Sequence, residues 1–173
     1  PNRRAYEEHV RGTHSLFERQ GITYSIVVFD IDNFKLLNDA HGHAAGDAAL
    51  QVTAKLLQSQ LRLSDRAFRI GGEEFALVLV ATDARHAEIV AERARRRIEA
   101  STVYFDGKQL RVTVSAGIAE ARDNVPSRDI LKQADAAMYA AKEAGRNRIE
   151  VARPELAAAG GARRDDRSSP ANR

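Results

Sequence analysis

Apolar residues along this chain recur with the spacing of helices in some segments and with the spacing of strands in others. Residues 3–20 predict a helix with Tyr6, Val10 and Phe17 on one side, and residues 22–31 predict a central strand. Further along we expect a short helix at 34–40, a longer helix at 44–61 and a hairpin at 65–80. A helix at 83–100, capped by Thr82 or Asp83, is followed by a small hairpin that turns at Asp106-Gly107 and whose second strand continues through 110–119. The last two expected elements are a helix at 127–144 that ends at Gly145 and a strand at 147–151. Helices that alternate with hairpin-joined strands indicate an α/β sandwich, an α+β fold with a mixed, largely antiparallel central sheet flanked by helices.

The bulk composition fits one domain of 173 residues with a proper core. Cysteine is absent, so disulfides and thiol chemistry are excluded. We find no apolar run of transmembrane length and no secretory signal, and we therefore expect a cytoplasmic fragment of a possibly larger or membrane-attached protein. Residues 151–173 carry five arginines and three acids, so most of the net charge of +3 lies there and not on a basic domain surface. We expect a domain at 1–151 and a disordered tail at 152–173, which lacks apolar periodicity.

The segment Gly71-Gly72-Glu73-Glu74-Phe75 joins the two strands of the hairpin predicted at 65–80. The glycine pair permits positive φ at the bend and lets a phosphate or sugar lie close to the main chain. Successive side chains of a strand point to opposite faces, so one glutamate can hold a metal while the other faces another part of a site. Taken alone, the segment also fits a plain tight turn with solvated acids.

A second acidic segment closes the strand predicted at 22–31, where Asp30 and Asp32 follow an apolar run. Carboxylates at the end of a buried strand, beside an acidic hairpin, suit a hard cation such as Mg²⁺. Lys35 follows closely, where an ammonium can meet a phosphate. Asn38 and Asp47 carry the amide and carboxylate groups that could read the N–H and carbonyl edges of guanine.

Together these segments closely resemble the GGDEF family of diguanylate cyclases, here in a Gly-Gly-Glu-Glu-Phe form. The resemblance is co-linear from residue 1 to about residue 151 and implies a nucleotide-cyclase-like, ferredoxin-related fold. It rests on the opening Pro1-Asn2-Arg3-Arg4, the segment from Phe29 to Asp47, the Gly-Gly-Glu-Glu-Phe hairpin, Val112 to Ala119, and Ala134 to Lys142 with Gly145-Arg146-Asn147.

The resemblance implies that each domain binds one GTP and that two domains face each other as a homodimer. Each 3′-hydroxyl attacks the α-phosphorus of the other GTP, which releases two pyrophosphates and closes cyclic di-GMP. Two Mg²⁺ or Mn²⁺ ions per half-site are implied, with Asp30, the Ile31 carbonyl and Glu73 as ligands. Glu73, Glu74 and Lys35 are the implied catalytic residues, and the base could be either glutamate or a metal-bound hydroxide. The implied substrate contacts are Asn33, Phe34, Lys35, Asn38, His43, Asp47, Gly71, Gly72, Lys142 and Arg146.

Several of these positions have a second interpretation. We expect Asp32 to point away from Asp30 and to hydrogen-bond the loop. His43 either approaches the guanine or ribose or caps the following helix. Lys142 and Arg146 lie four residues apart near a helix C-terminus, where cations also compensate the helix dipole. Asp47 favours GTP, because adenine lacks the donor pair that a carboxylate accepts from guanine.

Arg62-Leu63-Ser64-Asp65 ends five residues before the glycine pair, the spacing at which family members often bind their own product as an inhibitor. Arg93 would complete this product site. Because such four-residue patterns arise by chance, the spacing is the evidence, and the alternative is a local ion pair between Arg62 and Asp65.

Two other functions compete with a diguanylate cyclase. A non-catalytic receptor for GTP or cyclic di-GMP normally loses the glutamate pair or the Asp30-type ligand, and both are present here. A module that binds DNA or RNA is disfavoured because the chain has no concentrated basic face with interleaved aromatics.

Overall fold

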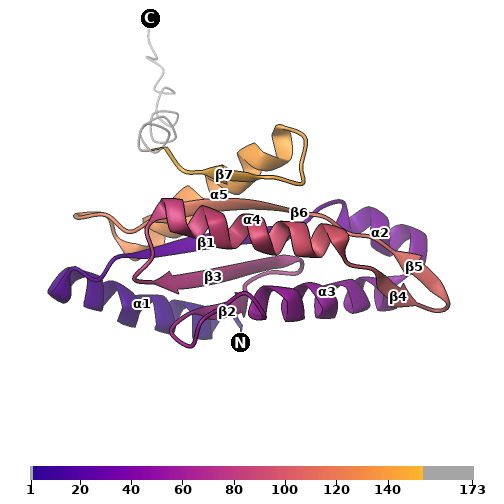
Figure 1. The fold of residues 1–173 in the computed structure, drawn as a ribbon, viewed down its shortest axis with the longest axis horizontal. Helices are drawn as coiled ribbons and strands as arrows, with labels where there is room; N and C mark the ends of the chain where they lie inside the picture. Colours follow the sequence, from indigo (N-terminus) through magenta and orange to yellow (C-terminus); the bar gives the residue numbers. More distant parts are fainter. Residues whose placement is uncertain (1, 154–173) are drawn as a thin grey trace, which may run out of the picture.

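The computed structural model describes residues 2–153 and shows a five-stranded sheet with helices on both faces (Figure 1). The strand order is β2-β3-β1-β6-β7, all neighbours being antiparallel except β6 and β7, while β4 and β5 form a separate hairpin. This confirms the expected α+β fold with a mixed, largely antiparallel sheet. The elements are α1 (Arg3–Gln20), β1 (Tyr24–Ile31), α2 (Phe34–His41), α3 (His43–Gln58), β2 (Arg66–Arg69), β3 (Glu74–Val80), α4 (Ala84–Ala100), β4 (Val103–Phe105), β5 (Lys108–Leu110), β6 (Val114–Glu120), α5 (Ser127–Glu143) and β7 (Ile149–Val151).

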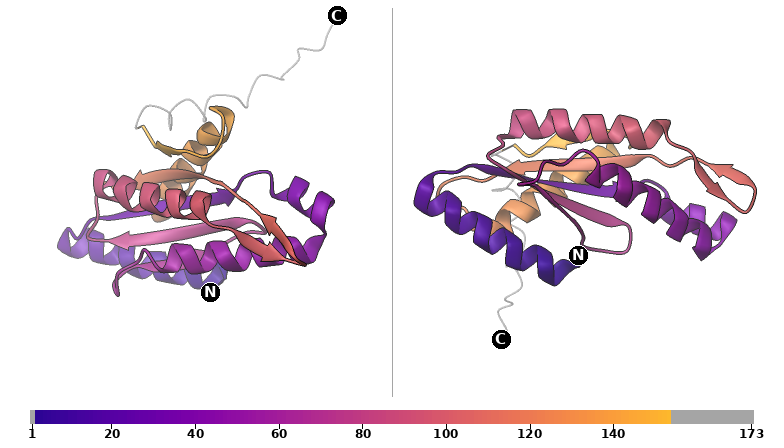
Figure 2. Two further views of the ribbon diagram at one scale, coloured as in Figure 1. Left: turned by 45° about the vertical axis from the view of Figure 1, so that its right-hand side comes forward. Right: turned by 60° about the horizontal axis from the view of Figure 1, so that its bottom comes forward.

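The central strand β1 is buried along its whole length and separates two hydrophobic clusters. Val27, Phe29 and Ile31 pack with α2, α3 and α4 on one face, and Tyr24, Ile26 and Val28 pack with α1 and α5 on the other. Figure 2 shows α4 and α1 on opposite sides of the sheet. Because β1 is paired on both edges and covered on both faces, Asp30, near the end of this strand, occupies a fixed position.

Helix boundaries follow local signals that the sequence carries. The Asn2 side chain accepts from the Ala5 N–H at the start of α1, and the Asp83 side chain accepts from the His86 N–H at the start of α4, so Asp83 and not Thr82 is the cap. Helix α5 approaches β6 closely at Gly117, where an added Cβ would lie 2.0 Å from the Ala134 carbonyl oxygen.

Several boundaries differ from the expectation, and among them β1 begins at Tyr24 and not at residue 22, and β7 begins at Ile149 and not at residue 147. The second strand of the small hairpin does not continue through 110–119, because β5 ends at Leu110 in its own two-stranded sheet and β6 begins at Val114 in the main sheet. Helix α3 ends at Gln58, and α5 ends at Glu143, one residue before the expected position. The predicted disordered tail lies almost wholly outside the described residues. Across residues 2–153, no helix combines the length and apolar character that a membrane span requires.

Candidate active site

The acidic site forms where β1 and β3 end side by side. Asp30 stands directly opposite Glu74 in the antiparallel pairing, so the two side chains leave the same face of the sheet. Glu73 precedes β3 and is tied to β1 through its carbonyl, which accepts from the Ile31 N–H at 3.3 Å. The structure therefore brings Asp30, Ile31, Glu73 and Glu74 together, and the register places Glu74 opposite Asp30.

Burial controls the charge of Asp30, whose exposed fraction is 4%. The pKa of this carboxyl is raised to about 6, mainly by burial, with smaller contributions from the negative charges of Glu73 and Glu74 and against the opposing effect of Lys142. Lys142 Nζ, from the end of α5, lies 2.7 Å from Asp30 Oδ1. The site therefore holds three carboxylates, of Asp30, Glu73 and Glu74, and the Lys142 ammonium pairs with the first of them.

The groups gathered here, the carboxylates of Asp30, Glu73 and Glu74 and the Ile31 carbonyl, offer only oxygen ligands, which suit a hard divalent cation. Within residues 2–153, however, no three acidic or histidine side chains are arranged as a complete metal cage. Any such ion would need further oxygens, which phosphate groups of a bound nucleotide can supply.

One part of the expectation for the glycine pair is wrong. The backbone at this bend does not take positive φ, because neither Gly71 nor Gly72 adopts it. At Gly71 an added Cβ would lie 2.2 Å from Glu74 Oε2, whereas at Gly72 it would meet no atom within 4 Å. Gly71 therefore makes room for the Glu74 carboxylate, and Gly72 leaves open space beside the main chain.

Asp32 has the predicted structural role but not the predicted direction. Its buried carboxylate accepts from Ser115 Oγ at 2.6 Å and from Thr113 Oγ1 at 2.7 Å. Ser115 is the partner of Asp30 in the β1–β6 pairing, so Asp32 reaches toward the face that Asp30 uses. The expectation that Asp32 points away was wrong, because residues two apart in a strand share a face.

Helix α2 brings a second group of predicted residues to the same end of the sheet. Asn33 precedes it with φ 55°, and α2 begins without a side-chain cap, so its first N–H groups are open to an anion. Phe34 is buried in the core and Lys35 is exposed. Asn38 packs on α3 at Gly46, where an added Cβ would lie 2.0 Å from Asn38 Oδ1.

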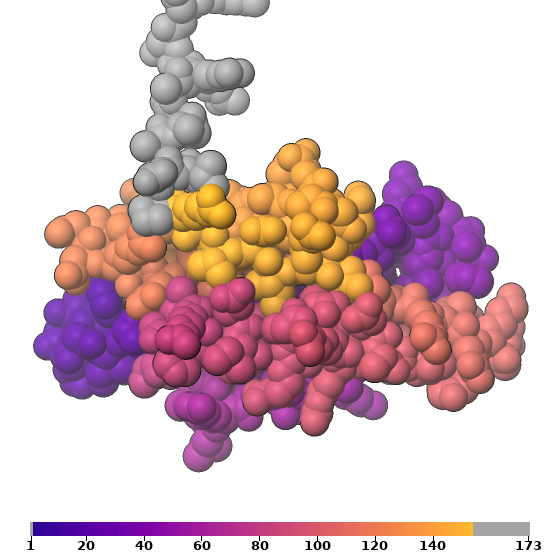
Figure 3. Space-filling model, turned by 45° about the horizontal axis from the view of Figure 1, so that its top comes forward, coloured from indigo at the N-terminus to yellow at the C-terminus, as the bar shows by residue number. Residues whose placement is uncertain are grey.

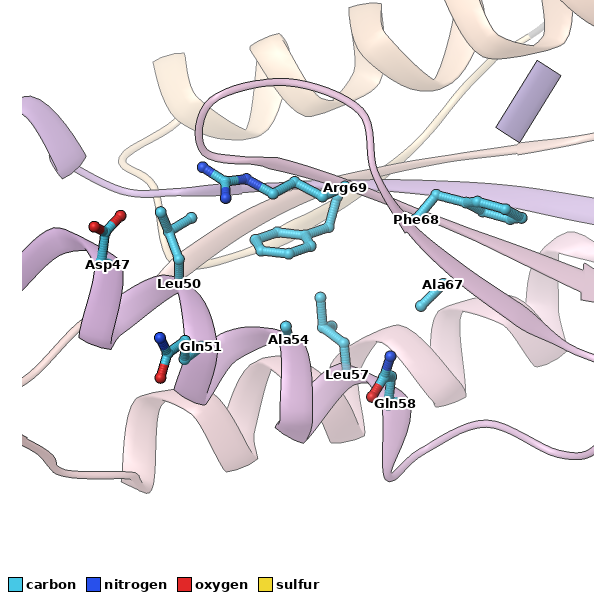
Figure 4. Close-up of a pocket in the computed structure, with 10 residues that line it drawn as sticks. Asp47, Leu50, Gln51, Ala54, Leu57, Gln58, Ala67, Phe68 and Arg69 are labelled. Carbon is cyan, nitrogen blue, oxygen red and sulfur yellow. The ribbon is translucent and has the colours of Figure 1, made fainter. Parts of the chain in front are cut away.

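A groove of about 360 Å³ runs between α3 and the β2–β3 hairpin. Asp47 and Arg69 lie at one end of this groove, and Leu50, Leu57 and Phe75 line it (Figure 4). Since Gly46 precedes Asp47, the contact of Asn38 with Gly46 brings both predicted base-reading residues near this groove. His43 is exposed in the first turn of α3, and Gly42 is the N-cap residue, so the capping role considered for His43 is wrong.

The family model described as "Diguanylate cyclase, GGDEF domain" matches residues 1–148. The chain belongs to the GGDEF family. It is 41% identical over 150 residues to diguanylate cyclase A of Treponema denticola, and 41% identical over 152 residues to diguanylate cyclase DgcP of Pseudomonas aeruginosa. These alignments cover 86% and 88% of this chain but 40% and 23% of the relatives, so the chain spans less than half of either protein.

Solved GGDEF structures share the fold. The active GGEEF domain of a diguanylate cyclase from Vibrio cholerae has a TM-score of 0.82 and 35% identity, over 88% of this chain and 97% of that one. The GGDEF domain of DgcB from Caulobacter crescentus, solved in complex with c-di-GMP, has a TM-score of 0.84 and 31% identity, over 87% and 90% of the two chains.

The predicted product site of this GGDEF domain lies in the loop between α3 and β2. The Asp65 carboxylate is buried and accepts from the Arg62 N–H at 3.0 Å and the Val80 N–H at 3.3 Å. The Arg62 side chain is exposed, and among residues 2–153 it makes no ion pair with Asp65. Arg93 reaches this loop from α4, where its Nε donates to Gln60 Oε1 at 2.8 Å.

Sequence reasoning missed two residues near the acidic cluster. The Arg69 guanidinium donates to the carbonyls of Gly71 and Gly72, at 3.3 Å and 2.6 Å, and so closes the hairpin tip. Its position just before the glycine pair was the available signal. Burial, and then the charge of Glu74, raise the pKa of Asp135 to about 6, against the opposing charge of Arg3. Asp135 precedes Lys142 by seven residues, or two helical turns, which places both on one face of α5.

Proposed function

We propose that this GGDEF domain condenses two GTP molecules into cyclic di-GMP. The observation that carries the proposal is the facing pair Asp30 and Glu74, with Lys142 at 2.7 Å from Asp30 and a groove beside the same hairpin. Phosphoryl transfer depends on positioning and on neutralising charge, and the arrangement supplies carboxylates, cations and a nucleotide-sized space together. The diguanylate cyclases among its relatives support the same activity.

In this proposal GTP lies across the end of the sheet. Asn38 and Asp47 read the guanine edge, and the carboxylate selects guanine over adenine because only guanine offers an N1–H and N2–H₂ donor pair. The backbone of Asn33 and Phe34, the side chains of Lys35, Lys142 and Arg146, and the open space at Gly72 receive the phosphates, with His43 near the guanine or ribose and Gly71 beneath Glu74.

Asp30, the Ile31 carbonyl and Glu73 are the proposed ligands of two Mg²⁺ or Mn²⁺ ions per half-site. These ions, when bound, neutralise the attacking and leaving oxygens. Glu74 is the partner acid, and its position opposite Asp30 makes it a second candidate for the same site. Lys142 can leave Asp30 for a phosphate oxygen once another cation neutralises the carboxylate, because it is attached at a helix end and is partly exposed.

Bond formation needs two copies of the domain. In each half-reaction the 3′-oxygen of one GTP bonds to the α-phosphorus of the other, the bond to pyrophosphate breaks, and either Glu73 or Glu74 takes the hydroxyl proton. Because each domain holds one GTP, a symmetric homodimer of half-sites performs both transfers. GTP places the reaction in the cytoplasm.

We also propose product inhibition at Arg62, Asp65 and Arg93. The exposed Arg62 guanidinium can donate to a phosphate or guanine edge, while Asp65 holds the loop by accepting two backbone N–H groups. The DgcB domain described in complex with c-di-GMP supports binding of this product by the fold.

The decisive experiment is HPLC analysis of products after incubation with GTP and Mg²⁺ or Mn²⁺. The wild-type domain should form cyclic di-GMP, and Glu74→Gln should abolish turnover while circular dichroism stays unchanged. Glu88→Gln, at an exposed position on α4, is the matched control and should retain turnover. Wild-type yields from Glu74→Gln would exclude the role given to this acid, and a wild type that binds GTP without converting it would favour a receptor domain.

A further inference from the structure

The buried carboxylate of Asp32 joins three segments that are distant in sequence. It accepts from Ser115 Oγ at 2.6 Å, from Thr113 Oγ1 at 2.7 Å and from the Asn147 N–H at 3.0 Å. Ser115 lies at the start of β6, Thr113 directly precedes this strand, and Asn147 lies between α5 and β7. Hydrogen bonds to an ionised acceptor are stronger than neutral ones, so this carboxylate fixes the chain leaving α5 to the end of β1.

Asn147 is in turn anchored to α4. Its Oδ1 accepts from Arg95 Nη1 at 2.6 Å, and its Nδ2 donates to Glu99 Oε1 at 2.8 Å. Figure 3 shows this orange and yellow segment lying against α4. Arg146 and Asn147 both have positive φ, 62° and 48°, a backbone conformation that costs roughly 1–2 kcal/mol per non-glycine residue. Contacts on both sides of the turn are therefore needed to hold it.

The segment held in this way carries the two cations proposed to meet the triphosphate. Lys142 lies in the last turn of α5, and Arg146 directly precedes Asn147. We propose that Asp32 and Asn147 are positioning residues, which hold the end of α5 so that Lys142 and Arg146 receive the GTP phosphates. This inference rests on the proposed function and assigns Asp32 neither substrate contact nor metal ligation.

The inference predicts a loss of affinity that depends on the number of phosphates. The proposed guanine contacts, Asn38 and Asp47, lie on α2 and α3, and neither is a hydrogen-bond partner of the Asp32 carboxylate, whose partners are Thr113, Ser115 and Asn147. Weakening the turn should therefore lower the affinity for a non-hydrolysable GTP analogue about tenfold, and leave the affinity for GMP within about twofold. Loss of folded protein would reduce both affinities together.

Ser115→Ala and Ser25→Ala form a matched pair for this test. Both serines are fully buried in the main sheet, and each donates one hydrogen bond, to Asp32 Oδ1 at 2.6 Å and to the Thr82 carbonyl at 2.8 Å. Only the first bond belongs to the turn at α5. Calorimetric titration with the GTP analogue and with GMP, both in Mg²⁺, should show a selective loss for Ser115→Ala and none for Ser25→Ala, while melting temperatures fall in both.

Asp32→Ala and Asp32→Asn separate positioning from metal ligation. The asparagine amide can keep its oxygen toward the Asn147 N–H and donate its NH₂ to Ser115, so it should restore most of the GTP affinity that the alanine loses. Asp32→Asn as damaging as Asp32→Ala would overturn the proposal, because a metal ligand would behave in that way. Equal GTP-to-GMP affinity ratios for Ser115→Ala and Ser25→Ala would overturn it as well. A wild type without preference for the GTP analogue over GMP would refute the proposed function and this inference with it.

Discussion

Replacing Asp30 with asparagine should stabilise the domain when no metal is bound. The carboxyl pKa of about 6, against 3.8 for an ordinary aspartate, means that the folded state binds more protons than the unfolded state between these values. The stability present below the unfolded pKa is therefore lost as the pH rises through the folded pKa. A shift of this size corresponds to about 3 kcal/mol at neutral pH, which is an upper value because the variant also loses the Lys142 ion pair.

We expect Asp30→Asn to raise the free energy of unfolding at pH 7.5 by about 1–3 kcal/mol, or roughly 2–12 °C in melting temperature. Thermal and urea unfolding between pH 4 and pH 8, in metal-free buffer, measures the difference from wild type. The gain should shrink below about pH 5, where the wild-type carboxyl is protonated. Asp39→Asn, at an exposed position on α2, is the control and should change stability little.

The same variant should lose turnover, since Asp30 is the central proposed metal ligand. Mg²⁺ with a non-hydrolysable GTP analogue should stabilise the wild type more than it stabilises Asp30→Asn. The stability difference between the two proteins should therefore shrink or change sign when these ligands are added. A variant that is less stable than wild type at pH 7.5, or whose stability difference does not change with pH, would refute the assignment of buried charge to Asp30.

Three further results are expected. Gly117→Ala should destabilise the domain by more than about 3 kcal/mol in chemical denaturation, because its Cβ would meet the α5 backbone, whereas Gly12→Ala, with open space around it, should not destabilise. Arg62→Ala should weaken cyclic di-GMP binding about tenfold or more by calorimetry and relieve inhibition, and unchanged affinity would remove this arginine from the product site. Specific activity should rise with protein concentration if two half-sites must meet, and a flat profile over a hundredfold dilution of a protein that sediments as a monomer would exclude that requirement.

Most of the fold could be predicted from the sequence because its signals are local. Caps such as Asn2 and Asp83, and the apolar run of β1, mark elements by short-range chemistry. The break after Leu110 could not be predicted in this way. Residues 110–119 predict one continuous strand, and only tertiary pairing decides which part joins the main sheet.

The candidate site was predictable as a set of residues but not as an arrangement. Motif spacing identified Asp30, Glu73 and Glu74, while the strand register that places Glu74 opposite Asp30 is a long-range property. The purpose of Gly71 was misjudged for the same reason, because its constraint is the Glu74 carboxylate and not the local backbone angle. Asn147 could be identified only as part of the Gly145-Arg146-Asn147 motif, and its contacts could not be predicted, since its partners lie just after β1 and on α4.

The burial and double pairing of β1 have a consequence for hydrogen–deuterium exchange. Amides in the middle of β1 should open only with global unfolding, so Asp30 is attached to the slowest-exchanging part of the domain. The Arg62 loop, by contrast, exposes Leu63 to 92% and lies in no helix or strand. Ligand binding at that loop can therefore be followed as protection of fast-exchanging amides, while the exchange rates of the β1 amides should not change.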